Sequence, residues 1–81
     1  MLNVKLKVTS TEQSEKAQEL LFGLDCYWPG DNPKEFQNTS AQYIYVNGDG
    51  NLSWSMDDEM YFIRHPFKEV SMRDLLIEIN K

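Results

Sequence analysis

The sequence feature that most constrains the fold is the run YIYVNGDGNLSWS, residues 43–55, in which a glycine-rich turn separates two strand-like segments. Aromatic and β-branched residues on both sides of the turn are typical of strands. The central Gly48-Asp49-Gly50 is typical of a three-residue hairpin loop that ends in a left-handed glycine. A loop of odd length pairs Val46 with Leu52 and separates apolar from polar residues, whereas a loop of even length mixes them. We therefore predict the three-residue loop, with Ile44, Val46, Leu52 and Trp54 on one apolar face and Tyr43 and Tyr45 on the other.

The same turn also resembles a calcium-binding loop, because Asn47, Asp49 and Asn51 alternate as oxygen ligands do. An EF-hand loop requires glycine at its sixth position and glutamate at its twelfth, where this chain has Leu52 and Asp58. The flanking segments are also strand-like, whereas an EF-hand loop lies between helices. We predict a turn without calcium, and since the chain has one histidine and one cysteine, no other metal and no cofactor.

The remaining segments predict an α+β fold in one domain, residues 1–81. Residues 2–8 alternate as a half-buried strand does. Capping residues predict a helix over 11–23, with Gly23 as its left-handed C-terminal residue, and a last helix after Ser71. The run EMYFIRH, residues 59–65, is interpreted as a strand, and a short strand is expected at 26–28 before a polar loop. The predicted fold is a small, mostly antiparallel sheet of three to five strands with two helices packed on one face, in the order β-α-(β)-β-β-β-α.

Charge and composition limit the function classes. A net charge of −5 argues against a general affinity for nucleic acid, because the phosphates would be repelled. No apolar run approaches the roughly 20 residues that cross a bilayer, so no membrane association is expected. A lone Cys26 makes no internal disulfide, which suits the cytoplasm.

The residues are also compatible with two other functions. If both helices cover the apolar face, the opposite face exposes Tyr43 and Tyr45 beside Lys5 and Lys7, which is the pattern of a sheet that stacks nucleic-acid bases. A nucleophilic pair of Cys26 with the single histidine, His65, would suit a small hydrolase or transferase, but no phosphate-binding or nucleophile motif accompanies it. We therefore predict that the chain is not an enzyme.

Several segments resemble a group of small, largely uncharacterised phage-encoded accessory proteins. The resemblance runs along nearly the whole chain in core and capping positions, which are Val8-Thr9-Ser10, Ser14, Gln18, Leu21, Phe22, Trp28-Pro29, Tyr43–Val46, Glu69–Ser71 and Asp74–Leu76. It implies a virus-encoded protein in a bacterial cytoplasm that occupies the surface of a host protein. It carries over no catalytic or binding residue.

The first functional hypothesis is a non-catalytic protein that binds and modulates, by inhibition, a host protein with a basic surface, such as a nucleic-acid-handling or defence enzyme. Carboxylates would steer a basic partner, while aromatic and methionine side chains supply contact energy. A homodimer is a further option. The predicted contact residues are Asp57, Asp58, Glu59, Trp54 and Met56, with a second corner at Trp28 and Asp31.

Overall fold

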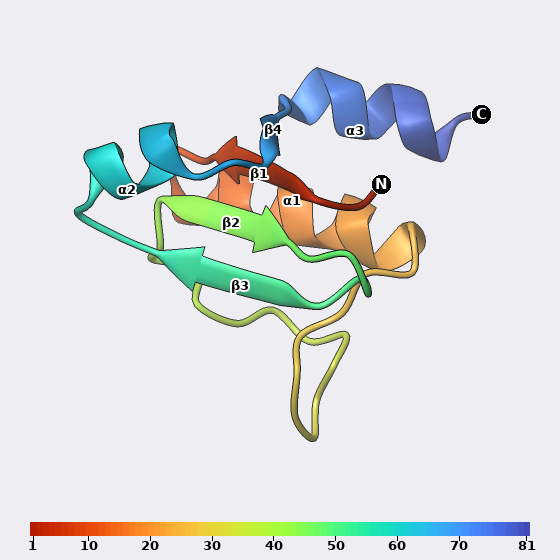
Figure 1. The fold of residues 1–81 in the computed structure, drawn as a ribbon. Coiled ribbons are helices and arrows are strands. Elements are labelled where there is room, and N and C mark those ends of the chain that lie inside the picture. The colour runs from red at the N-terminus through yellow and green to blue at the C-terminus, as the bar shows by residue number, and fades with distance from the viewer.

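The computed structural model covers residues 1–81 and confirms the α+β class (Figure 1). Four strands form one mixed sheet, and three helices surround it. In chain order the elements are β1 (Val4–Lys7), α1 (Thr11–Gly23), β2 (Tyr43–Val46), β3 (Leu52–Ser55), α2 (Glu59–Arg64), β4 (Lys68–Glu69) and α3 (Met72–Ile79).

The sheet has the strand order β3-β2-β1-β4, so β3 and β4 are its two edges. The β2–β3 hairpin and the β1–β2 pair are antiparallel, whereas β4 runs parallel to β1. Val46 pairs with Leu52, as the odd loop requires. The N–H of Asn47 donates to the oxygen of Asn51 at 2.9 Å, and Gly50 has φ of 90°, so the predicted three-residue loop with a left-handed glycine is confirmed.

The main core lies between one face of the sheet and the two predicted helices, α1 and α3. Ser10 caps α1 by accepting from the N–H of Gln13, and Ser71 forms a capping box with Asp74 at the start of α3. Both helices turn apolar side chains toward the sheet, because these side chains recur at helical spacing. The core residues shared by the sheet and these helices include Val4, Leu6, Ile44, Val46, Leu52, Ala17, Leu20, Leu21 and Leu75.

The helix α1 ends differently from the prediction. Gly23 is its last helical residue, and the left-handed residue is Asp25, with φ of 66°. The N–H of Cys26 donates to the oxygen of Leu21 at 2.9 Å, which closes the turn. A Cβ at Gly23 would lie 2.5 Å from Cδ1 of Ile79, so a larger residue there would require the flexible end of the Ile79 side chain to move.

The prediction of a strand at residues 59–65 is wrong, because residues 59–64 form α2. Asp58 caps this helix by accepting from the N–H of Tyr61 at 2.9 Å, which satisfies a donor that a helix start leaves free. The expected strand at 26–28 is reduced to a single bridge between Tyr27 and Asn51. As a result, α2 packs on the face of the sheet opposite the main core, where Phe62 contacts Tyr43 and Tyr45.

A buried glutamine anchors the long segment between α1 and β2. The side-chain oxygen of Gln18 accepts from Nε1 of Trp28 at 2.9 Å and from the N–H of Gln37 at 3.1 Å. Its amide nitrogen donates to Ser14 and to the oxygen of Gln37. Gln18 therefore uses all four of its hydrogen-bonding positions to hold this segment against α1.

Candidate protein-binding surface

The segment from Met56 to Ile63 carries an unusual density of exposed apolar side chains. Within these eight residues, four large apolar side chains are 37 to 56% exposed. Three consecutive carboxylates, also exposed, lie among them. We call this set the α2 surface, and its members are Met56, Met60, Tyr61, Ile63, Asp57, Asp58 and Glu59.

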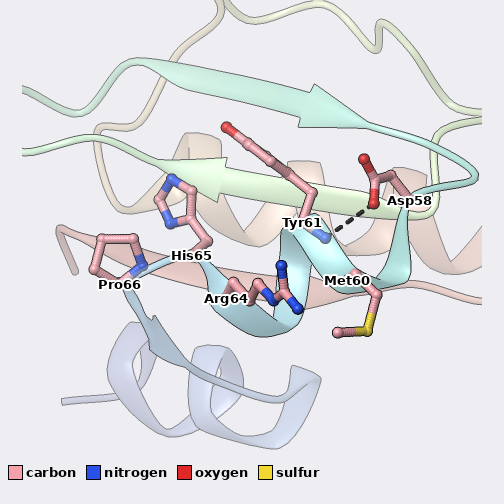
Figure 2. Close-up of a pocket in the computed structure, with 6 residues that line it drawn as sticks. All are labelled: Asp58, Met60, Tyr61, Arg64, His65 and Pro66. Atoms are coloured by element: carbon pink, nitrogen blue, oxygen red, sulfur yellow. Dashed lines mark hydrogen bonds between the residues drawn. The ribbon is translucent and has the colours of Figure 1, made fainter.

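A shallow hollow of about 430 Å³ lies along α2, lined by residues of the helix and its two ends (Figure 2). Tyr61 and His65 extend toward the sheet on one side of the helix, while Met60 and Arg64 project on the other. The Asp58 carboxylate is tied down at the N-terminal end by the N–H of Tyr61. The hollow thus offers apolar contact area between the negative side chain of Asp58 and the positive side chain of Arg64.

Lys5 of β1 anchors α2 to the sheet. Its side chain is 5% exposed, and its ammonium donates to the oxygens of Phe62, Ile63 and His65, the last two at 3.2 and 2.9 Å. The three donors of the ammonium thus meet three carbonyls at the C-terminal end of the helix, where a cation also complements the helix dipole. The ammonium lies 4.7 Å from the centre of the Phe62 ring.

Aromatic rings complete the contact between α2 and the sheet. Phe62 stacks on Tyr43 with ring centres 4.7 Å apart, and His65 packs on Tyr45 at the same distance. The N–H of Phe67 donates to Nδ1 of His65 at 3.3 Å, which requires an unprotonated Nδ1. Burial, and then the positive charge of Lys5, lower the pKa of His65 below its ordinary value.

The prediction of an open tyrosine face is wrong. Tyr43, Tyr45 and Lys5 are all at most 5% exposed, because α2 covers them. Only Lys7 of the predicted nucleic-acid set is exposed. Base stacking needs accessible aromatic faces, so this face does not bind bases in the way predicted.

Cys26 and His65 lie on opposite sides of the sheet, so they form no nucleophilic pair. Cys26 belongs to the main core, and His65 packs on Tyr45 of the other face. Burial raises the pKa of the Cys26 thiol, which disfavours the reactive thiolate.

The predicted contact residues divide into three groups. Asp57, Asp58 and Glu59 are exposed beside Met56, as expected of a contact. Trp28 is wrong as a contact because it is 2% exposed and bonded to Gln18, while Asp31 near it is exposed. Trp54 is 46% exposed but lies on the α1 side of the edge strand β3, away from α2.

The sequence prediction missed Met60, Tyr61 and Ile63, because it placed them in a strand. The signal that could have revealed them is the N-cap residue Asp58, followed by the acidic Glu59 in the first turn and the basic Arg64 in the last turn. In the helix, Phe62 is the one buried residue, whereas Met60, Tyr61 and Ile63 each expose about half of their surface.

No protein-family model, no curated protein and no solved structure matches the chain. Its helices include none that has both the length and the apolar character to cross a membrane. Histidine, cysteine and carboxylate side chains nowhere gather in a group of three or more that would suit a metal ion.

Proposed function

We propose that this chain is a non-catalytic protein-binding domain and that it attaches through the α2 surface to a partner with a basic surface. The observation that carries the proposal is the exposure of four large apolar side chains within residues 56–63. Clustered exposed apolar side chains mark interaction sites, and aromatic and methionine residues are enriched at protein interfaces. The carboxylates of Asp57, Asp58 and Glu59 favour a partner that presents lysine or arginine.

The anchoring of α2 supports the same function. Lys5 and the aromatic contacts of Phe62 hold the helix on the sheet, so its outer side chains are presented by a rigid support. A preorganised surface loses less conformational freedom when it binds. We propose that the partner is a bacterial host protein, for example a nucleic-acid-handling or defence enzyme, and that the bound domain inhibits it. The resemblance to small phage accessory proteins supports this choice.

Two matched double variants test the proposal. Met60→Ser with Ile63→Ser removes apolar area from the α2 surface, at side chains that are 51% and 56% exposed. Leu76→Ser with Ile77→Ser removes comparable area from α3, at side chains that are 42% and 53% exposed. Each protein is immobilised, incubated with lysates of several bacterial hosts, and its captured proteins are quantified by mass spectrometry.

We expect the unmodified chain and the α3 variant to capture the same host protein, and the α2 variant to lose it. Raising the salt concentration to about 0.5 M should weaken the capture, because salt screens the carboxylates. Equal capture by the α2 variant would contradict the proposed surface. Capture of no protein from any host would contradict the proposed function.

A further inference from the structure

The edge strand β3 has backbone groups that face away from the sheet. Ser53 and Ser55 pair with Tyr45 and Tyr43 of β2. Hydrogen-bonded and non-hydrogen-bonded pairs alternate in antiparallel strands, and the bond between Asn47 and Asn51 makes these two pairs the hydrogen-bonded ones. The N–H and C=O of Trp54 between them therefore point to solvent, and no other group of the chain bonds to them.

The start of the same edge is already occupied. The N–H of Leu52 donates to the oxygen of Tyr27 at 2.8 Å, and the N–H of Tyr27 donates to the oxygen of Gly50 at 3.0 Å. The segment around Tyr27 leaves the edge after this bridge, since the N–H of Trp28 turns to the oxygen of Pro33. The free part of the edge thus begins at the C=O of Leu52 and extends past Trp54.

The free edge lacks the features that usually protect such edges. Proteins blunt exposed edges with charged residues, proline or bulges. The opposite edge strand, β4, is two residues long, and both Lys68 and Glu69 are charged and exposed. In contrast, residues 51–56 contain neither a charge nor a proline, and Trp54 exposes 46% of its surface there.

Charge indicates which occupant fits this edge. Asp49 lies in the turn that precedes the occupied start of the edge, Asp57 and Asp58 follow its free end, and residues 35–63 contain no lysine, arginine or histidine. Hydrogen bonds from Asn51 lower the pKa of Asp49, so it remains charged. If a second copy paired its β3 antiparallel to this one, centred on Trp54, Asp57–Glu59 of each chain would lie near Asp49 of the other chain. Like charges brought together across two strands repel, which disfavours a second copy as the occupant.

We propose that β3 accepts an extended segment of a partner protein as an added strand, and that this segment carries lysine or arginine near its ends. The backbone of Trp54 supplies hydrogen bonds to the added strand, and its indole packs against a side chain of that strand. The carboxylates at both ends of the edge pair with the basic residues. This inference rests on the proposed protein-binding function and describes how such a partner is held.

Two substitutions at Trp54 separate the backbone from the side chain. Trp54→Val removes the indole and keeps the N–H, whereas Trp54→Pro removes both. Proline is tolerated on an edge strand where the N–H faces solvent, so both variants should keep the sheet. The probe is a displayed library of random linear peptides, selected on the unmodified chain. Enriched peptides are then synthesised, and their affinities for the chain and its variants are measured by fluorescence anisotropy.

We expect the enriched peptides to be rich in lysine and arginine and to bind Trp54→Pro at least about tenfold more weakly than Trp54→Val. In the unmodified chain, a saturating peptide should slow hydrogen exchange of the Trp54 amide by about tenfold or more, a result that needs no variant to fold. Failure to enrich any peptide, or equal binding to the two variants without protection of that amide, would overturn the inference. Binding that is lost in Met60→Ser with Ile63→Ser but kept in Trp54→Pro would overturn it while leaving the proposed function intact.

Discussion

Replacing Lys5 with methionine tests whether a buried ammonium holds α2 on the sheet. Methionine is unbranched and adaptable, so it fills the same space without a charge. The substitution removes the donors to the oxygens of Phe62, Ile63 and His65 and the cation over the Phe62 ring. The C-terminal end of α2 then has no side-chain partner from β1.

The expected loss of stability in Lys5→Met is the difference between the favourable interactions of the ammonium and the cost of burying it. Hydrogen bonds from a charged donor contribute about 1.5–3 kcal/mol each, and a cation at a helix C-terminus contributes about 0.3–2 kcal/mol. The hydrogen-bond and helix-dipole contributions overlap because the same ammonium makes both. They are opposed by the cost of taking that ammonium out of water on folding, which is several kcal/mol. The bonds to Ile63 and His65 are only partly buried, so their carbonyls regain water. We expect unfolding free energy to fall by about 2 kcal/mol, and Tm by about 8–16 °C.

Lys7→Met is the matched control, because Lys7 lies on the same strand but is exposed. Its unfolding free energy should change by no more than about 0.5 kcal/mol. Circular dichroism during urea and thermal unfolding measures both variants, and hydrogen exchange of α2 amides shows whether the loss is centred there. The reasoning is refuted if Lys5→Met is as stable as the unmodified chain, or if the two substitutions have equal effects.

Three further perturbations test other parts of the structure. Gln18→Leu leaves Nε1 of Trp28 and both backbone groups of Gln37 without their partner, so we expect urea unfolding to show a loss of about 3 kcal/mol; a loss below about 1 kcal/mol would argue against the network. Gly50→Ala places a Cβ at φ of 90° and should lower stability by about 1 kcal/mol or more, whereas Gly48→Ala, which meets only the flexible Asn3 side chain, should cost less. His65 has a pKa below its ordinary 6.5 when folded, so the unfolded chain binds its proton first as the pH falls. Unfolding free energy should therefore decrease as the pH drops below about 6.5, and His65→Gln should reduce this slope; an unchanged slope would exclude His65 as its source.

The sequence predicts those parts of the fold in which a single local pattern determines the secondary structure. The hairpin follows from residue parity around Gly48 and Gly50, and the capped ends of α1 and α3 follow from Ser10 and Ser71. In each case the side-chain pattern and the turn chemistry agree, so few alternatives remain.

The helix α2 was missed because its residues favour two structures. The run from Glu59 to Arg64 contains strand-forming aromatic and β-branched residues, whereas the Asp58 cap, the acidic Glu59 in the first turn and the basic Arg64 in the last turn favour a helix. Six residues are also too few for a helix that is stable alone, so tertiary contacts with Lys5 and Tyr43 decide the outcome. No local pattern contains those contacts.

The candidate site depends on that missed helix, so its prediction was incomplete. The exposure of the carboxylates of Asp57 to Glu59 is predictable because charged residues are visible in the sequence. The sequence predicts a contact at the corner of Trp28 and Asp31, but Trp28 is buried. Its burial depends on Gln18, ten residues away in the chain, and only the fold brings the two together.

Site-specific photo-crosslinking tests the central claim, binding through the α2 surface, most directly. A benzophenone-bearing phenylalanine replaces Met60 in one variant and Ile77 in another, at side chains that are 51% and 53% exposed. Irradiation in bacterial lysate should join the Met60 variant to one host protein, excess unmodified chain should suppress the product, and the Ile77 variant should not form it. The absence of any product from the Met60 variant, or the same product from both variants, would contradict the claim.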